Sequence, residues 1–275
     1  MLRFVGRLRR VERTIGRKAR AMSALGHDRD GRPATFIVVR GARTFKPRRR
    51  GLNATRLARF EANLHHWGLT ETGGRLDLGA LFPESANVCV EIGSGNGDLA
   101  SAYVAAHPAD ALIAIDVHRP GIARLLDDIE QLGWSNLRVV EGDALVFLDR
   151  LADGSIDELW AFFPDPWPKN SQAHRRLVSD ERIQQLARVI KPKGVLRLAT
   201  DVAAYADQMR RVVQGSGLFE SVLEARPQWR IETAFERTGR QADRNSVDLC
   251  CRRSQCEPKR QHDMATPSTG PRNTA

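Results

Sequence analysis

Short apolar runs and amphipathic segments alternate along the middle of the chain, and this alternation predicts its secondary structure. The runs are rich in aliphatic residues, as buried strands are, whereas the segments between them repeat apolar residues at helical spacing. In one such segment Ile122, Leu125, Leu126 and Ile129 fall on a single helical face. The pattern predicts strands over residues 87–92, 111–116, 137–140, 156–163, 195–200, 219–225 and 247–251. It predicts helices over residues 98–106, 119–132, 145–151, 181–190 and 203–213.

This order of strands and helices predicts a fold class. A helix that connects two parallel strands must pack back onto the sheet, so alternating short elements indicate a parallel sheet with helices on both faces. We expect a doubly wound α/β fold with a mostly parallel, seven-stranded sheet, preceded by a basic N-terminal extension. Ligands of such folds bind at the carboxyl ends of the strands, so the residues at those ends are the first candidates for a site.

The charge of the chain is distributed unevenly. Its 275 residues are 41% hydrophobic and 28% charged, which is typical of a globular protein with one large domain or two small ones. The net charge is +10, but residues 1–53 carry 16 Lys and Arg against 3 Asp and Glu, residues 54–251 carry 22 against 28, and residues 252–275 carry 5 against 2. This distribution, an acidic body with basic ends, excludes a protein that coats nucleic acid with a uniformly basic surface. The basic ends themselves point to a polyanionic partner.

Other sequence features bear on the compartment. Cys89, Cys250, Cys251 and Cys256 lack the paired spacing of a zinc site or a disulfide framework, so we expect reduced cysteines, no metal and a cytoplasmic location. No apolar run is long enough to span a bilayer. Residues 1–20 lack the apolar core of a secretory signal, and their arginine-rich, acid-poor composition fits either a solvated basic arm or an organellar transit peptide.

A glycine-rich loop follows the first predicted strand. Glu91 precedes Gly93, Gly95 and Gly97 in the pattern E-x-G-x-G-x-G, and a helix follows. Glycines allow a tight turn and a close approach of the backbone to a ligand. A dinucleotide-binding loop needs G-x-G-x-x-G, but Asp98 stands at the last position here and would repel a pyrophosphate. The spacing disfavours an NAD-dependent oxidoreductase, and the loop instead resembles motif I of class I S-adenosylmethionine-dependent methyltransferases, whose cofactor carries a sulfonium cation.

Two further carboxylates end the next two strands. Asp116 ends the second strand, where a carboxylate can accept hydrogen bonds from both hydroxyls of an adenosine ribose. Asp143 follows the third strand, where it can accept a hydrogen bond from the adenine amino group. Each of the two has an alternative role as the N-cap of the next helix. Together with Glu91 they form three acidic strand ends around one glycine loop, which favours a cofactor site.

The fourth predicted strand ends in F-F-P-D-P-W-P-K, residues 162–169. Three prolines in five residues fix φ and remove backbone donors, so they stiffen the loop that carries Asp165 and Trp167. This string closely resembles the signature of the bacterial tRNA (guanine-N7-)-methyltransferase family, the TrmB-type enzymes. The resemblance covers residues 40–252 and includes R-T-F-K-P-R-R-R-G at 43–51, I-D-V-H at 115–118, A-T-D at 199–201 and T-A-F-E at 233–236.

The resemblance implies an activity and a role for each matched residue. The enzyme would transfer a methyl group from S-adenosyl-L-methionine to N7 of guanine 46 in the variable loop of tRNA. N7 has a free lone pair, so Asp165 would act as the catalytic residue without being a strong base, by accepting hydrogen bonds from the guanine edge and offsetting the charge of the methylated base. The cofactor would contact Glu91, Gly93, Gly95, Gly97, Asp116, Asp143 and Asp165. The substrate would contact Lys169, Arg175, Arg176, Asp201, Thr233, Ala234, Phe235 and Glu236.

One segment departs from the family pattern. After Lys169 the family usually has a dense basic run, whereas residues 171–174 here are S-Q-A-H and only Arg175 and Arg176 follow. We hypothesise that the basic N-terminal arm compensates for the missing cations in tRNA binding. Two alternatives to the N7 activity are an exocyclic-amine methyltransferase acting on another RNA and an inactive RNA-binding module of the same fold; the intact cofactor motif disfavours the second.

The chain is therefore expected to have four parts. Residues 1–40 form a basic, flexible arm, residues 41–85 a basic RNA-binding lead-in that contains a helix, residues 86–252 the methyltransferase domain, and residues 253–275 a disordered tail. The expected partner is tRNA, and no protein partner is evident in the sequence. Trp167 has three open roles: stacking on a base, lining the cofactor pocket, or packing in the core.

Overall fold

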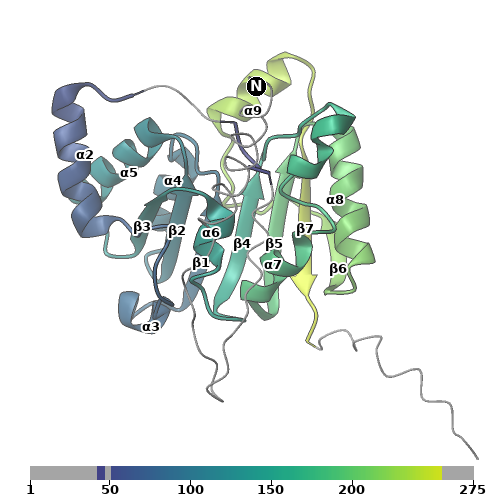
Figure 1. Ribbon diagram of the computed structural model, residues 1–275, viewed down its shortest axis with the longest axis horizontal. Helices are drawn as coiled ribbons and strands as arrows, with labels where there is room; N and C mark the ends of the chain where they lie inside the picture. The colour runs from purple at the N-terminus through teal and green to yellow at the C-terminus, as the bar shows by residue number, and fades with distance from the viewer. Residues whose placement is uncertain (1–41, 47–50, 256–275) are drawn as a thin grey trace, which may run out of the picture. The chain divides into compact units, whose positions relative to one another are not determined.

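Seven strands form one central sheet (Figure 1). They are β1 (Asn87–Ile92), β2 (Asp110–Asp116), β3 (Leu137–Glu141), β4 (Ile156–Phe162), β5 (Ile190–Thr200), β6 (Phe219–Glu224) and β7 (Val247–Arg253). The computed structural model describes residues 42–46 and 51–255. The strand order is β3-β2-β1-β4-β5-β7-β6; β7 is antiparallel to both of its neighbours, and the other neighbouring pairs are parallel. The predicted doubly wound, mostly parallel α/β fold is confirmed.

Helices cover both faces of this sheet (Figure 1). They are α2 (Ala54–Trp67), α3 (Leu78–Leu81), α4 (Asp98–Ala106), α5 (Arg119–Leu132), α6 (Ala144–Leu148), α7 (Ile183–Val189), α8 (Ala203–Gly215) and α9 (Ala234–Gln241), together with the 3₁₀ helix η1 (Asn170–Arg175). Residues of α2, α4 and α5 belong to the hydrophobic core on one face. Residues of α3, α6, α7 and α8 belong to the core on the other face.

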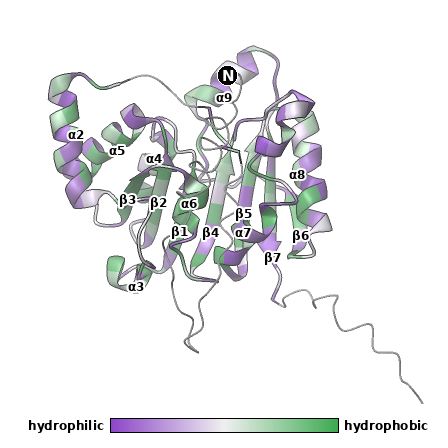
Figure 2. Ribbon diagram, viewed as in Figure 1, coloured by the Kyte–Doolittle hydropathy of each residue, from purple (hydrophilic) through white to green (hydrophobic). Residues whose placement is uncertain are grey.

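The two cores explain why the strands were visible in the sequence. Leu112 and Ala114 of β2 belong to one core, and Ile113 and Ile115 to the other. Since successive side chains of a strand point to opposite faces, a strand covered on both sides is apolar throughout. In Figure 2 hydrophobic colour dominates β2, whereas α2, α5 and α8 alternate between hydrophobic and hydrophilic residues.

A few element ends differ from the predictions for local reasons. The strand predicted to end at residue 163 ends at Phe162, because Phe163 has φ of 54° and leaves the extended conformation. The helix predicted over 181–190 is shorter and β5 starts earlier than expected, since Pro192 disfavours a helical Lys191. The structure also contains α3, α9 and η1, which the apolar pattern did not predict.

Some predictions concern residues outside the described ranges. These are the basic arm (1–40), residues 41 and 47–50 of the lead-in, and residues 256–275 of the tail, including Cys256. The helix expected in the lead-in is α2. Within 42–46 and 51–255, no helix has both the length and the apolar character needed to cross a membrane.

The sheet has a topological switch point at its centre. Strands β1 and β4 are neighbours, but the chain runs outward from β1 through β2 to β3 on one side and from β4 to β5 on the other. Connections that leave in opposite directions open a crevice at the carboxyl ends of the two central strands. We call the carboxyl ends of β1, β2 and β3 the β1–β3 edge, and those of β4 and β5 together with α9 the β4–β5 edge.

Candidate functional site

The loop between β1 and α4 leaves open space at the β1–β3 edge. Gly93, Gly95 and Gly97 have φ of 85°, 60° and 84°, a left-handed conformation that other residues rarely adopt. A Cβ on Gly97 would lie 2.5 Å from the Leu125 side chain of α5, so this glycine permits close packing of the loop on the helix. A Cβ on Gly93 or Gly95 would meet no heavy atom within 4 Å. These two glycines let a ligand approach the loop backbone closely.

Asp116 connects the second strand to this loop. Its Oδ2 accepts a hydrogen bond from the Gly95 N–H (2.6 Å), and its Oδ1 accepts one from the His118 N–H (2.7 Å). The alternative role as N-cap of α5 belongs to His118 instead, although the His118 side chain makes no capping bond. The half-buried carboxylate holds the glycine loop and retains a lone pair on each oxygen for a ligand.

Asp143 combines a structural role with a position at the predicted site. Its Oδ1 accepts a hydrogen bond from the Leu145 N–H (3.0 Å) and so caps α6, which was the alternative role. Its own N–H donates to Glu71 Oε2 (2.6 Å). Burial raises the pKa of Asp143, and the nearby Glu71 charge raises it further. Sequence reasoning missed Glu71, which lies between α2 and α3 and reaches Asp143 only through the fold.

Glu91 is a buried acid whose carboxylate has an unsatisfied oxygen. The residue is 3% exposed. Burial, and then the charge of Asp116, raise the pKa of Glu91 to about 8. Neither Glu91 Oε2 nor Ser94 Oγ has a hydrogen-bond partner among the residues that the structure describes. Leaving a buried polar atom unpaired costs about 1–3 kcal/mol, which a cationic or hydrogen-bonding ligand would recover.

The residues of the β1–β3 edge fit S-adenosylmethionine. Its sulfonium and ammonium cations suit an edge with three acidic side chains, Glu91, Asp116 and Asp143, which form no ion pair within the described ranges. The open side of Gly93 and Gly95 leaves space for the ligand, and the orphaned Glu91 oxygen requires a donor. The pyrophosphate of a dinucleotide placed beside this loop would be repelled by the Asp116 carboxylate.

At the β4–β5 edge, the proline-rich loop after β4 has an unusual conformation. Phe163 and Trp167 have φ of 54° and 42°. Asp165 is half-buried, and its Oδ2 accepts a hydrogen bond from the Lys46 N–H (2.7 Å). Trp167 is buried, and its Nε1–H donates to the Thr44 carbonyl (2.9 Å). Of the three roles left open for Trp167, the burial excludes stacking on an incoming base.

The cations after this loop differ in their availability. Lys169 is exposed, at the start of η1. The Arg175 guanidinium lies 4.1 Å from the centroid of the Trp167 ring. Arg176 is half-buried, donates to the Pro166 carbonyl (2.8 Å) and the Trp167 carbonyl (3.3 Å), and also contacts Gln208. Of the three predicted substrate cations, Lys169 is exposed to solvent, whereas Arg175 and Arg176 hold the loop.

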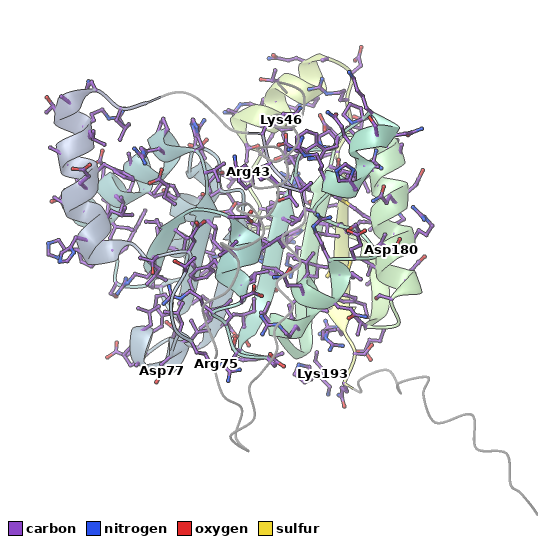
Figure 3. All side chains as sticks on the ribbon, in the orientation of Figure 1. Arg43, Lys46, Arg75, Asp77, Asp180 and Lys193 are labelled. Carbon is purple, nitrogen blue, oxygen red and sulfur yellow. The ribbon has the colours of Figure 1, made fainter. Side chains whose placement is uncertain are left out.

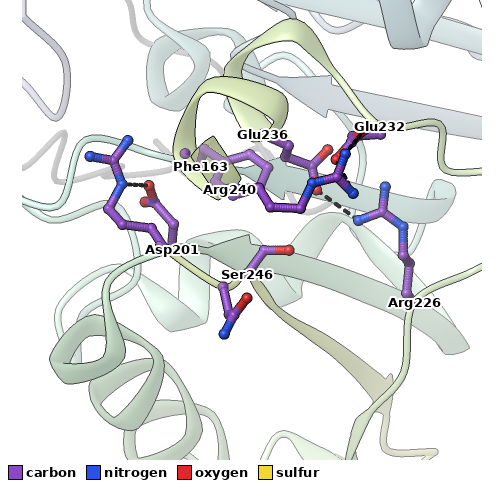
Figure 4. Close-up of a pocket in the computed structure, with 10 residues that line it drawn as sticks. Phe163, Asp201, Arg226, Glu232, Glu236, Arg240 and Ser246 are labelled. Atoms are coloured by element: carbon purple, nitrogen blue, oxygen red, sulfur yellow. Dashed lines mark hydrogen bonds and ion pairs between the residues drawn. The ribbon is translucent and has the colours of Figure 1, made fainter. Parts of the chain in front are cut away.

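A pocket of about 380 Å³ lies beside this loop, between α9 and the end of β5 (Figure 4). Its wall contains the predicted substrate residues Asp201 and Glu236. Asp201 Oδ2 accepts a hydrogen bond from Arg244 Nε (2.8 Å). Phe163 also lines the pocket, and its ring centroid lies 5.1 Å from that of the exposed Phe235. An aromatic pair beside paired acids and arginines can hold a planar, polar base.

The T-A-F-E string forms the start of α9. Thr233 is the N-cap, its side chain accepts a hydrogen bond from the Glu236 N–H, and the Glu236 side chain accepts one from the Thr233 N–H. This reciprocal arrangement is a capping box, and its T-x-x-E spacing is the signal that could have predicted α9 from the sequence. Ala234 and Phe235 are exposed, whereas Glu236 is buried. Phe235 is therefore the member of the string with a large exposed side chain.

A buried cluster of charges fixes α9 to the sheet. The Arg230 side chain is fully buried and donates to Glu236 and to Asp248 of β7, with closest distances of 2.8 Å to each. Arg226 pairs with Glu236 as well (2.7 Å). Burial alone would raise the pKa of Glu236, but hydrogen bonds and charges from the two arginines hold it below its ordinary value. The Arg230 guanidinium also lies 5.4 Å from the Phe163 ring centroid. Sequence reasoning missed Arg230, because nothing local marks a buried arginine.

Comparison with known proteins identifies relatives. Residues 85–249 match a family described as "Putative methyltransferase". The tRNA (guanine-N(7)-)-methyltransferase of Streptomyces avermitilis is 36% identical over 242 residues, which cover 86% of this chain and 83% of that protein. The protein of the same name from Alcanivorax borkumensis is 36% identical over 231 residues, which cover 82% of this chain and 96% of that protein.

A solved structure supports the fold independently. The 16S rRNA methyltransferase KamB aligns with a TM-score of 0.50 at 15% sequence identity, over 66% of this chain and 95% of that chain. At this identity the likeness concerns the fold alone.

Proposed function

The chain belongs to the tRNA (guanine-N(7)-)-methyltransferase family, and from this premise we propose that it methylates N7 of guanine 46 in the variable loop of tRNA. The methyl donor is S-adenosyl-L-methionine, which supplies an electrophilic methyl group on a sulfonium. One observation carries the proposal: an open glycine loop with a buried, partly unpaired Glu91 lies across the switch point from a pocket lined by Phe163, whose ring contacts the exposed Phe235.

The β1–β3 edge binds the donor. Gly93, Gly95 and Gly97 form the loop that the donor contacts, and Asp116 accepts hydrogen bonds from the ribose hydroxyls with its remaining lone pairs. Asp143 accepts one from the adenine amino group through the oxygen that does not cap α6. Glu91 faces the cationic end of the donor, because a positive charge there offsets the cost of its burial.

Asp165 acts on the guanine. As the N7–carbon bond forms and the sulfur–carbon bond breaks, positive charge moves from the sulfonium to the purine ring. N7 attacks with a free lone pair, so no proton has to be removed first. The Asp165 oxygen that is not bonded to Lys46 is available to accept a hydrogen bond from the guanine edge and to stabilise the developing charge. Alignment of N7 with the methyl group supplies most of the acceleration.

The β4–β5 edge holds the nucleotide. Asp201 contacts the base, and Phe235 with Ala234 offers an exposed surface at the start of α9. Lys169 contacts the RNA backbone. N7 lies in the deep groove of an RNA helix, so the guanine enters the pocket from an exposed or extruded position. Four further residues of the predicted substrate set act by positioning these contacts: Arg175, Arg176, Thr233 and Glu236.

The proposal includes a cellular compartment and a division of the chain into four parts. We place the protein in the cytoplasm with tRNA as its partner; Cys89, Cys250 and Cys251 are free thiols in the structure. The boundaries at 40, 85 and 252 divide it into a basic arm, an RNA-binding lead-in, the methyltransferase domain and a tail.

Product analysis with a matched pair of substrates tests this function. Purified protein is incubated with methyl-labelled S-adenosylmethionine and an unmodified tRNA transcript, or with the same transcript carrying adenine at position 46, and the RNA is digested to nucleosides. We expect label in 7-methylguanosine with the first RNA and none with the second. Label only in 2-methylguanosine or 6-methyladenosine overturns the N7 assignment. Equal 7-methylguanosine from both RNAs overturns position 46 alone.

A further inference from the structure

Residues 42–46 cross the proline-rich loop that carries the catalytic carboxylate. We call these five residues the strap. Three main-chain groups of the strap make contacts there: the Lys46 N–H with Asp165, the Thr44 carbonyl with the Trp167 indole, and the Arg43 carbonyl with the Nε–H of Arg175 (3.1 Å). Figure 3 labels Arg43 and Lys46 at the end of the sheet where α9 lies.

The loop beneath the strap does not hold its own conformation. Phe163 and Trp167 are both left-handed, which costs a bulky residue about 1–2 kcal/mol each. Pro164, Pro166 and Pro168 have no N–H to stabilise the turn. Such a conformation persists only where surrounding structure determines it.

Two groups of contacts hold the proline-rich loop in this conformation. From the inner side, the Arg176 side chain donates to the Pro166 and Trp167 carbonyls. From the outer side, the strap accepts the indole hydrogen bond, and Lys46 Nζ lies 5.4 Å from the Trp167 ring centroid. Trp167 is left 4% exposed between them. The strap is thus the outer clamp of a loop whose inner clamp is Arg176.

We propose that the strap positions Asp165 for methyl transfer through the Lys46 main-chain N–H. That N–H binds Oδ2 and so fixes the carboxylate rotamer, while Oδ1 stays available to accept a hydrogen bond from the substrate. The side chain of Lys46 is not required for this, since the donor is a backbone group. The inference rests on the proposed function in that Asp165 is the group that contacts guanine.

A pair of substitutions at one position separates the backbone from the side chain. In the full chain, Lys46→Pro removes both the N–H and the cation, and Lys46→Ala removes the cation only. We expect Lys46→Pro to lower kcat by about 30-fold or more while the KM for S-adenosylmethionine changes by less than about twofold, because misplacement of a reacting group acts on the chemical step. The kcat loss in Lys46→Ala should be about tenfold smaller. Equal kcat losses in the two variants, or a change only in the KM for tRNA, would show that the strap is an RNA contact and overturn the proposal.

A spectroscopic measurement tests the clamp without relying on activity. The protein has 5 tryptophans, and with 5-fluorotryptophan in all of them the Trp167 resonance is the one that disappears in Trp167→Phe. Lys46→Pro should shift this fluorine resonance and leave the other four in place, whereas Lys46→Ala should shift it less. An unmoved Trp167 resonance in Lys46→Pro rejects the strap as a clamp. A shifted resonance in a protein that methylates no tRNA would instead reject the proposed function and retain the clamp.

Discussion

The two edges of the sheet treat their carboxylates in opposite ways. Glu91, Asp116 and Asp143 at the β1–β3 edge form no ion pair with any residue in the described ranges, and Glu91 is buried nonetheless. At the β4–β5 edge, Asp201 pairs with Arg244, and Glu236 pairs with two arginines. The three acids of the first edge lack a salt-bridge partner, whereas arginines neutralise Asp201 and Glu236 at the second edge. Asp165 differs from those two, because its bond is to the Lys46 main-chain N–H and it forms no ion pair within the described ranges.

This difference follows from the charge of what each edge binds. A carboxylate without a cationic neighbour attracts a sulfonium or an ammonium, which restores the balance when it binds. Under the proposed function the partner at the other edge is a polyanion, which unpaired Asp201 and Glu236 side chains would repel. Pairing neutralises those acids while keeping their oxygens as acceptors for the N–H groups of a base. The comparison therefore predicts separate failures when each edge is changed.

The largest expected effect comes from breaking the charge cluster of the β4–β5 edge. Arg230→Met leaves the buried Glu236 and Asp248 with only the partly exposed Arg226 as a cationic partner, so the free energy of unfolding should fall by about 3–5 kcal/mol. Chemical denaturation at neutral pH measures it. The matched control is Arg240→Met, which removes an arginine that is 69% exposed and paired with Glu232 on the surface, and should cost less than about 1 kcal/mol. Similar losses in both would mean that the cluster does not hold α9.

The second effect separates chemistry from donor binding. Asp165→Asn should lower kcat by about 100-fold, since it removes the negative charge beside the developing cation. Gly95→Val should instead weaken S-adenosylmethionine binding, because valine at a φ of 60° is strained and its side chain enters the open face of the loop. Calorimetric titration of the donor compares them. Asp165→Asn should retain donor affinity better than Gly95→Val, and equal weakening in both contradicts this division.

The third effect is a pH dependence at the β1–β3 edge. The pKa of Glu91 is raised from 4.5 to about 8, so the folded protein holds a proton there that the unfolded chain releases. Stability from this group should fall as pH rises from 4.5 to about 8 and then level off. A cationic donor favours the carboxylate, so donor affinity should rise over the same range, by at most about tenfold per pH unit. Titrations in buffers of different ionisation enthalpy count the released proton. Glu91→Gln should remove the slope, and a slope that persists assigns it to another group.

The smallest expected effect concerns the basic arm. Truncation of residues 1–40 should raise the KM for tRNA by a few-fold at about 0.15 M salt, leave the KM for S-adenosylmethionine unchanged, and reduce the salt dependence of the tRNA KM. Steady-state kinetics at several salt concentrations provide the measurement. An unchanged salt slope would mean that Lys169 and the rest of the β4–β5 edge supply the phosphate contacts.

The β1–β3 edge was predictable because its signals are local. Gly93, Gly95 and Gly97 take a conformation that few other residues adopt, and Asp116 and Asp143 directly follow apolar runs that strands buried on both faces require. For the β4–β5 edge, the sequence predicted which residues belong to the site but not which of them contact one another. The proline-rich string indicated the position of Asp165. The T-x-x-E spacing of the α9 capping box is visible in the sequence, but α9 has too few apolar residues for periodicity to predict the helix.

By itself, the sequence determined the order of elements, the parallel sheet and the glycine loop, because side-chain periodicity and backbone sterics act over a few residues. Only the tertiary structure decided which charges are paired. Lys46 and Asp165 are 119 positions apart, and Arg230 meets Asp248 and Glu236 inside the protein. Glu236, the acid of T-A-F-E, thus belongs to a buried charge cluster. Arg175 and Arg176, the cations after Lys169, hold a strained loop in place. Pairing depends on which strands become neighbours, and that choice is made by the whole core rather than by any segment of the chain.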